Sequence, residues 1–218
     1  MQKFDEKLIY TYDNAISPLL CKIIIDMYEK EDGQYNGIVG SGYNPDIKET
    51  IDFVIPNGVS RWERIYSFLN KELAKNLKTY FNQLNVIDKC NILSPRFIDS
   101  IFLQYDSFMM QKYFKNKGKF EYHHDFLCDF EKSRYRIITF IFYLNDVIEG
   151  GETEVFGHTH IKPTAGKLLL FPASWTFPHC GKMPISSDKY IITGWLYINK
   201  NHYVNKRVNE LLQNNKTI

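Results

Sequence analysis

The sequence predicts a mainly β protein of the α+β class, in which helices come first and β-structure follows. Helix start signals and apolar residues at helical spacing occur in the first 95 residues. From Phe97 onward, the chain divides into short runs rich in β-branched and aromatic residues, with turn residues between them. Many short strands without intervening helices are typical of a β-sandwich or jelly roll. The hydrophobic fraction of 44% is ordinary for a globular protein, whereas the high aromatic fraction of 16% is concentrated in these runs and fits a β-rich core with room for a ligand pocket.

The chain length of 218 residues suits one domain with a sizeable hydrophobic core. We divide this single domain, 1–218, into helical N-terminal support at 1–95, a jelly-roll core at 96–200 and a C-terminal tail at 201–218. The tail is polar apart from a short helical pattern, which is typical of a peripheral segment.

Charge and hydropathy argue against several broad functions. The formal net charge of +2 gives no case for a nucleic-acid-binding surface or a membrane patch. No apolar run reaches the length of a membrane span, and the charged N-terminus lacks the apolar region of a signal peptide. The four cysteines have no CxxC spacing, so we interpret them as free thiols in a reducing, cytoplasmic compartment. The sequence does not indicate the oligomeric state.

One strand and two helices are expected before residue 95. Residues 8–12 alternate as a short strand does. Ser17 as N-cap, with Pro18 in the first turn, begins a helix over 19–30. Ser60 and Glu63 form a capping box that opens a second helix. This helix carries apolar residues on one face, at Ile65, Leu69, Leu73, Leu77 and Tyr80. We expect that face to pack against a sheet.

The segment 33–55 between these helices is expected to be a loop. It is polar and is interrupted by Gly37, Gly40, Gly42 and Pro45. Long loops beside a pocket often bind substrate, although nothing in this segment names one.

The strands of the second half are expected in six runs. They are 97–98, 101–103, 112–114, 137–144, 167–171 and 190–198. Glycine-containing turns separate several of them, at 117–118, 149–151 and 165–166.

A candidate metal site lies in the stretch 121–125. Side chains alternate along an extended strand, so His123 and Asp125 point to one face and His124 points to the other. An imidazole and a carboxylate supply two metal ligands, and His179 is the candidate for the third. Two His and one carboxylate on one side of a metal form the facial triad of non-heme Fe(II) oxygenases.

Further features follow this stretch in order. They are Gly118-x-Phe120-x-x-His123-x-Asp125, Arg136-Ile137-Ile138-Thr139, Tyr143-Leu144-Asn145-Asp146, Gly150-Gly151-Glu152-Thr153, Pro163-x-x-Gly166-x-Leu168-Leu169-Leu170-Phe171-Pro172, His179-x-Gly181-x-x-Pro184-Ile185, and Lys189-Tyr190 with Thr193 and Trp195. In this order, residues from about Tyr105 to Ile198 resemble the catalytic core of the 2-oxoglutarate/Fe(II)-dependent oxygenases, in the prolyl 4-hydroxylase-like branch.

The resemblance implies a double-stranded β-helix (jelly-roll) core with the N-terminal helices packed on the outside, and a catalytic role for the single domain. It implies that the second His faces the His-x-Asp strand across the barrel mouth. By resemblance, His123, Asp125 and His179 hold Fe(II). The co-substrates would be 2-oxoglutarate and O2, with ascorbate as an optional further cofactor.

The family anchors the far carboxylate of 2-oxoglutarate with a basic residue ten positions after the second His, and Lys189 stands there. A buried dicarboxylate needs a cation and hydroxyl donors. Thr193 and Trp195 share a strand face with Lys189, so both are expected in the pocket. Tyr143 and Tyr113 are further candidates for hydroxyl or wall contacts.

The aromatic contact to the co-substrate stays open at this stage. The family usually places an aromatic residue nine or ten positions before the first His ligand, which fits both Phe114 and Tyr113. Tyr105 and Thr139 are alternatives.

Other polar residues near these motifs receive simpler interpretations. His124 is expected at the pocket rim, and His158 and His160 are expected to be exposed. Arg136 is either structural or in contact with substrate. The cysteines near the proposed ligands are expected to be small wall residues.

The implied reaction is hydroxylation of an unactivated C–H bond, with a peptidyl proline as the leading substrate. Lysyl hydroxylases share the layout but usually have Arg at the position of Lys189, and a small-molecule hydroxylase is a further alternative. The partner would thus be a peptide, a protein or a small molecule. Two other classes remain: a metal-binding jelly roll without oxygenase activity, and a zinc hydrolase with an activated water.

Overall fold

The computed structural model describes residues 5–87, 103–105 and 107–199. The elements are η1 (Asp5–Leu8), β1 (Tyr10–Tyr12), α1 (Pro18–Tyr28), β2 (Tyr35–Asn36), β3 (Lys48–Glu49), β4 (Ile51–Val54), α2 (Ser60–Ile87), β5 (Leu103–Tyr105), β6 (Met109–Tyr113), β7 (Lys119–His123), β8 (Cys128–Asp129), β9 (Arg134–Tyr143), β10 (Thr153–Val155), β11 (Thr159–Ile161), β12 (Leu168–Pro172), β13 (His179–Gly181) and β14 (Lys189–Asn199). The strand expected at 97–98, the first part of the one expected at 101–103, and the tail at 201–218 lie outside the described residues.

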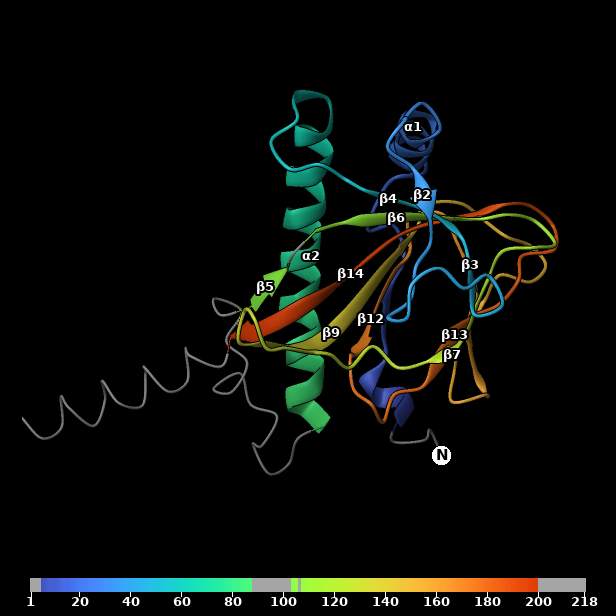
Figure 1. Cartoon of the computed structure of the whole chain (residues 1–218). Helices are drawn as coiled ribbons and strands as arrows, with labels where there is room; N and C mark the ends of the chain where they lie inside the picture. Colours follow the sequence, from blue (N-terminus) through green and yellow to red (C-terminus); the bar gives the residue numbers. More distant parts are fainter. Residues whose placement is uncertain (1–4, 88–102, 106, 200–218) are drawn as a thin grey trace, which may run out of the picture.

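The strands form two antiparallel sheets. The larger sheet has the order β1-β12-β9-β14-β6-β4-β2, with β5 paired to β14 and β8 paired to β9. The smaller sheet has the order β11-β10-β13-β7-β3. Figure 1 shows α2 on one side of the larger sheet and strands β7 and β13 on the other side. The expectation of a mainly β, jelly-roll architecture is confirmed.

The central strands of the larger sheet are apolar on both faces because each face covers a different core. On β9, Phe140 and Phe142 belong to the first hydrophobic cluster, whereas Ile141 and Tyr143 belong to the second. Strand alternation sends successive side chains to opposite faces. The continuous apolar run Leu168–Phe171 on β12 divides in the same way. Strands buried on both faces read as near-continuous hydrophobic runs.

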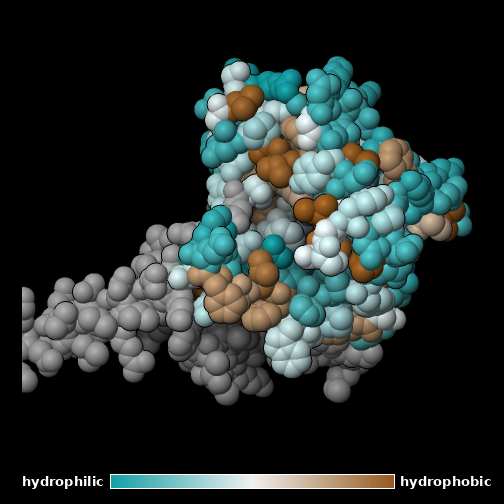
Figure 2. Space-filling view, viewed as in Figure 1, coloured by the Kyte–Doolittle hydropathy of each residue, from teal (hydrophilic) through white to brown (hydrophobic). Residues whose placement is uncertain are grey.

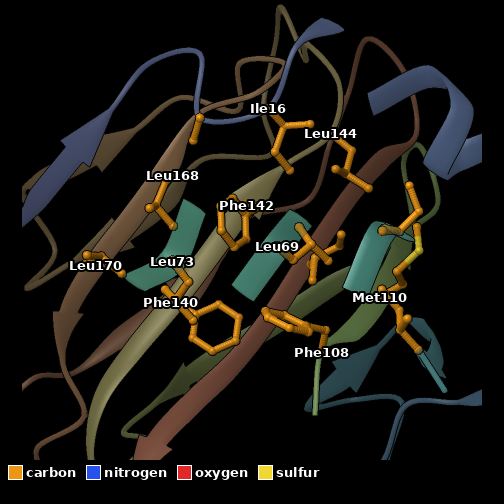
Figure 3. Packing of buried hydrophobic residues seen from close by; sticks show 14 of the residues in the cluster. Ile16, Leu69, Leu73, Phe108, Met110, Phe140, Phe142, Leu144, Leu168 and Leu170 are labelled. Carbon is orange, nitrogen blue, oxygen red and sulfur yellow. The ribbon is translucent and has the colours of Figure 1, made fainter. Parts of the chain in front are cut away.

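The first core lies between the larger sheet and the helices. Leu69 and Leu73 of α2 share a buried cluster with Phe140, Phe142 and Leu168 of the sheet. Figure 3 shows these side chains close together. Their spacing along α2 is helical, which places them on one face of that helix. The second core lies between the two sheets.

The helix boundaries follow from local chemistry. Ser17 is the N-cap of α1, and its hydroxyl accepts a hydrogen bond from the backbone N–H of Leu20. The capping box at Ser60 is displaced, because Ser60 already lies inside α2 and the carbonyl of Val59 accepts from the backbone N–H of Glu63. Among the described helices, none combines the length and the apolar character needed to cross a membrane.

The expectation of a loop over 33–55 is wrong, because three short strands lie there. β4 pairs with β6 and β2 pairs with β4, which extends the larger sheet. β3 pairs with β7 at the edge of the smaller sheet. Residues 1–95 therefore contribute strands to both sheets as well as helices. β1 adds a further strand, paired with β12.

We predict that Leu69→Ala lowers the free energy of unfolding by about 2–5 kcal/mol, because it removes a fully buried side chain between α2 and the sheet. Lys71→Ala, at an exposed position of the same helix, should change it by no more than about 0.5 kcal/mol. Urea denaturation of both variants measures the difference. Equal effects would contradict the packing of this helix face on the sheet.

Candidate metal centre

Two histidines from neighbouring strands meet at one end of the smaller sheet. β7 and β13 run antiparallel, and His123 lies directly opposite His179 in the pairing. The two imidazole centroids are 4.3 Å apart. Ligand atoms of His123, His179 and Asp125 all lie within 4.8 Å of one another, so the three residues could hold a metal ion.

Two details differ from the sequence-based expectation. His179 lies beside His123 in the same sheet, because β13 pairs directly with β7, and does not face it across the barrel mouth. β7 ends at His123, so Asp125 lies just beyond the strand. Its carboxylate is held instead by β9, where the Thr139 hydroxyl donates to Oδ2 at 2.7 Å.

Backbone carbonyls orient both imidazole rings. Nδ1 of His123 lies 2.8 Å from the carbonyl oxygen of Glu121, and Nδ1 of His179 lies 3.1 Å from that of Phe177. A carbonyl only accepts, so each Nδ1 carries the proton and donates. Each Nε2 is then left with a free lone pair, which is the form in which His binds a metal. These Nε2 atoms lie 3.7 Å and 3.3 Å from the Asp125 oxygens.

The electrostatics of the cluster favour a neutral imidazole beside a charged carboxylate. Burial, together with the neighbouring His179, lowers the pKa of His123 to about 4. Burial opposes ionisation of Asp125, but the adjacent histidines and the Thr139 hydrogen bond together lower its pKa. Burial also opposes protonation of His179, but the charge of Asp125 raises its pKa. A divalent cation would suit this set of two nitrogens and one carboxylate.

A cavity of about 670 Å³ opens beside these three residues. This volume lies within the usual range for small-molecule sites. Alternate residues of three strands of the larger sheet form its floor: Met109, Gln111 and Tyr113 of β6, Thr139 and Ile141 of β9, and Lys189, Ile191, Thr193 and Trp195 of β14. Exposed apolar residues, among them Ile38, Phe126 and Leu127, lie at the mouth. Figure 2 shows apolar side chains gathered near the middle of the viewed face.

Lys189 is buried in this cavity, with 1% of its surface exposed. Its Nζ donates to the carbonyl oxygen of Gly151 at 3.0 Å and lies 3.9 Å from the ring centroid of Tyr113. Within the described part of the chain, no carboxylate forms an ion pair with it. Burial lowers its pKa to about 7.

The hydroxyl groups expected to assist Lys189 are already committed to protein acceptors. Thr193 lines the cavity, but its hydroxyl donates to the carbonyl of Phe140 at 2.9 Å. Tyr113 also lines the cavity, and its hydroxyl donates to Oε1 of Gln111 at 3.1 Å. Tyr143 stands behind the cavity wall. Its hydroxyl donates to Oγ1 of Thr153, and it is Thr153 that lines the cavity.

Trp195 contributes an unused donor to the cavity wall. Its indole Nε1 is buried and has no hydrogen-bond partner among the described residues. The guanidinium of Arg136 lies 3.6 Å from the Trp195 ring centroid, and its Nε donates to the hydroxyl of Tyr197. The unpaired indole N–H of Trp195 and the buried ammonium of Lys189 are both donors in one cavity, so they suit a ligand that carries hydrogen-bond acceptors.

Other histidines and cysteines close to these motifs in sequence have different surroundings. His124 is exposed at the cavity mouth. His158 and His160 lie away from the cavity, where Nε2 of His160 is 2.6 Å from a Glu154 carboxylate oxygen. Cys180 is a buried free thiol in the cavity wall, and Cys128 is a half-buried free thiol. Tyr105 and Phe114 are not among the residues that line the cavity.

Sequence reasoning missed three polar residues of the cavity wall. Lys48 and Asp52 form a buried ion pair, and Gln111 lies against it. The alternation of Lys48, Thr50 and Asp52 on one face could have indicated a strand. Because Lys48, Thr50 and Asp52 are all polar, however, the segment lacks the alternation of apolar and polar residues that usually indicates a strand.

The same fold occurs in solved prolyl hydroxylases. The viral collagen prolyl hydroxylase of Paramecium Bursaria Chlorella virus-1, solved as a 2OG complex, is 18% identical, with 90% of this chain and 99% of that chain covered and a TM-score of 0.60. A prolyl-4-hydroxylase of Pseudomonas putida is 14% identical, with 86% and 91% covered and a TM-score of 0.61.

A third structure is a prolyl hydroxylase of Trichoplax adhaerens in complex with a peptide fragment of the hypoxia inducible factor oxygen degradation domain. It is 19% identical, with 89% of this chain and 85% of that chain covered and a TM-score of 0.60. At these identities, the similarity shows a common fold. No curated protein matches the sequence.

A family model matches the part of the chain that contains this site. Residues 108–197, which run from the start of β6 almost to the end of β14, match the 2OG-Fe(II) oxygenase superfamily. This range includes all three candidate metal ligands and Lys189. The chain therefore carries, in residues 108–197, a match to the 2OG-Fe(II) oxygenase superfamily, a family of dioxygenases that use Fe(II), 2-oxoglutarate and O2.

Proposed function

We propose that this dioxygenase hydroxylates a peptidyl proline within a single catalytic domain, with His123, Asp125 and His179 holding Fe(II) and Lys189 binding the far carboxylate of 2-oxoglutarate. Lys189 is the observation that carries this proposal. A buried ammonium without a counter-ion is unfavourable, and a bound carboxylate would compensate it. Neither a metal-binding scaffold nor a zinc hydrolase has a use for such a cation.

The side chains of the three proposed metal ligands are preorganised by hydrogen bonds within the protein. The carbonyls of Glu121 and Phe177 hold the two imidazole rings, and Thr139 holds the carboxylate of Asp125. Little reorganisation is then needed when a metal binds. Fe(II) bound there would supply O2 activation, coupled to conversion of 2-oxoglutarate to succinate and CO2, for C–H hydroxylation.

The rest of the cavity would position the co-substrate. One N–H of the Lys189 ammonium donates to the carbonyl oxygen of Gly151, and its other N–H groups can donate to a carboxylate. The indole N–H of Trp195 is a further free donor. Thr193 and Tyr113 would contribute the shape of the pocket, because their hydroxyl protons point to Phe140 and Gln111. Tyr143 would act through Thr153.

Three observations support a peptide substrate that carries proline. The mouth of the cavity presents exposed apolar side chains, Ile38, Phe126 and Leu127, which suit an apolar ring next to the metal centre. The three solved structures reported above are named as prolyl hydroxylases, and one of them holds a peptide. A lysine at the anchor position also leans toward the prolyl type.

The metal and co-substrate assignment can be tested in one titration. Anaerobic Fe(II)-loaded protein titrated with 2-oxoglutarate should develop a weak visible metal-to-ligand charge-transfer band. His179→Ala should lose the band because the third ligand is gone. His160→Ala, outside the cavity, should keep it. A parent protein that binds iron but shows no band would count against the assignment.

Lys189 should make 2-oxoglutarate binding depend on pH. Its pKa is about 7 in the ligand-free protein, and a bound carboxylate would raise it. Binding above pH 7 therefore requires uptake of a proton, so the Kd should rise by roughly tenfold per pH unit above about pH 7 and stay level just below it. Calorimetric titration from pH 6 to pH 9 measures this profile.

Two variants of Lys189 distinguish the contribution of its positive charge to 2-oxoglutarate affinity from the effect of its loss of a proton at high pH. Lys189→Arg stays charged across this range, so its profile should be flat wherever it still binds. Lys189→Ala should weaken binding by roughly two orders of magnitude or more, the usual effect of breaking a buried charge pair. Lys182→Ala, at an exposed position that pairs with Glu154 outside the cavity, should change little. Unchanged affinity in Lys189→Ala would favour the hydrolase or scaffold alternative.

The substrate class can be tested with matched peptides. Proline-containing and lysine-containing peptides are incubated with the Fe(II)-loaded protein, 2-oxoglutarate and air, and mass spectrometry locates the added oxygen atom. We expect oxygen on proline, with one succinate per hydroxylation. Oxygen found on lysine alone would contradict proline as the substrate and identify a lysyl hydroxylase. Turnover of free small molecules alone would contradict a peptide substrate.

A further inference from the structure

A buried ion pair in the cavity wall takes no part in the reaction described above. Lys48 and Asp52, at 3% and 1% exposure, lie 2.6 Å apart and both line the cavity. Lys48 belongs to β3 and Asp52 to β4. Burying two charges is unfavourable unless other groups satisfy them. The surroundings of Asp52 therefore need an explanation.

Asp52 accepts hydrogen bonds from three side chains on different segments. Lys48 Nζ and Gln111 Nε2 donate to Oδ2, at 2.6 Å and 3.4 Å, and Thr50 Oγ1 donates to Oδ1 at 2.7 Å. Lys48 belongs to the smaller sheet and Gln111 to the larger sheet. The Asp52 carboxylate thus connects the two sheets inside the cavity wall.

The network continues to the proposed co-substrate anchor. Gln111 Oε1 accepts from the Tyr113 hydroxyl at 3.1 Å, and the ammonium of Lys189 lies over the Tyr113 ring. The amide of Gln111 cannot simply reverse, because the Asp52 carboxylate only accepts and requires the NH2 end. Asp52 therefore fixes the direction of the hydrogen bond at Tyr113.

At its other end the network supports the rim of the cavity mouth. The backbone N–H of Gly37 donates to the carbonyl of Thr50 at 2.8 Å. A Cβ at Gly37 would lie 2.1 Å from Thr50 Oγ1 and 3.3 Å from Asp52 Oδ1, so the polar cluster occupies the space beside this glycine. Residues 38–40, which follow, line the mouth.

We propose that Asp52 and Gln111 are positioning residues that couple the rim segment 35–40 to the co-substrate pocket, so that filling the pocket orders the rim where substrate enters. The identity of the co-substrate in this statement rests on the function proposed above. Coupling of this kind is reciprocal, so substrate at the rim would also tighten co-substrate binding.

Hydrogen exchange on the intact protein tests the coupling in two arms. Without ligand, Gln111→Leu should raise amide exchange in segment 35–40 by roughly fivefold, the effect expected when one buried hydrogen bond is lost. Tyr113→Phe, one bond further along the network and more conservative, should raise it in the same direction. With Fe(II) and 2-oxoglutarate under anaerobic conditions, the parent should show protection of 35–40 that Gln111→Leu lacks.

Affinity provides a second readout that general destabilisation would not reproduce. Introduced into the parent protein, Gln111→Leu should weaken 2-oxoglutarate binding by roughly fivefold. Introduced into the Tyr113→Phe variant, it should weaken binding hardly at all, because Gln111 acts through its hydrogen bond with the Tyr113 hydroxyl. Glu154→Gln is the matched control, since Glu154 is also a buried carboxylate that pairs with a lysine but lies outside the cavity. It should leave both readouts unchanged.

The outcomes separate this proposal from the one on which it rests. Binding of 2-oxoglutarate without protection of 35–40, or additive effects in the double variant, would overturn the coupling alone. No binding by the parent would overturn the co-substrate assignment, while the ligand-free exchange arm still decides the coupling. Exchange in 35–40 that is equal in the parent, Gln111→Leu and Tyr113→Phe would overturn the coupling in either case.

Discussion

The double burial of strands β9, β12 and β14 is the constraint on which the rest of the structure depends. Each of these strands presents one set of side chains to the helices and the alternate set to the smaller sheet. The hydrophobic effect thus holds three layers together through one sheet. Because the layer between the sheets is only partly filled by apolar groups, the same alternation that builds the core also places Thr139, Lys189 and Thr193 in a cavity. The cavity is in this sense a polar continuation of the second core.

Within that cavity, charge is distributed unevenly. Asp125 stands among histidines and a hydroxyl donor, whereas Lys189 stands against an aromatic ring and a carbonyl. One end therefore favours a cation and the other favours an anion. A ligand that joins a metal at one end to a carboxylate at the other satisfies both ends at once, and a low dielectric between them strengthens each interaction.

Long, strongly apolar elements could be predicted from the sequence, and short or polar ones could not. The runs 137–144 and 190–198 correspond to β9 and β14 within a few residues, because their β-branched and aromatic content is high. β10, β11 and β13 have three residues each, too few for a periodic signal. Residues 48–52 were interpreted as loop because the buried face of that segment is polar. His179 could be named as a partner of His123 from the resemblance, but its place on the adjacent strand depends on pairing, which the sequence alone does not reveal. The hydroxyl partners of Tyr143 and Thr193 likewise depend on backbone positions in three dimensions.

The strands at the ends of the two sheets have a consequence for behaviour in concentrated solution. β1 and β2 end the larger sheet, and β11 and β3 end the smaller one, with two or three residues in each. An unpaired edge is a template for pairing with another chain, and its danger grows with its length and flatness. Edges this short offer few free backbone groups, and β3 consists of a lysine and a glutamate. The sheet ends in the described part of the chain therefore give neighbouring molecules little opportunity to extend these sheets into aggregates, although the strands are rich in aromatic residues.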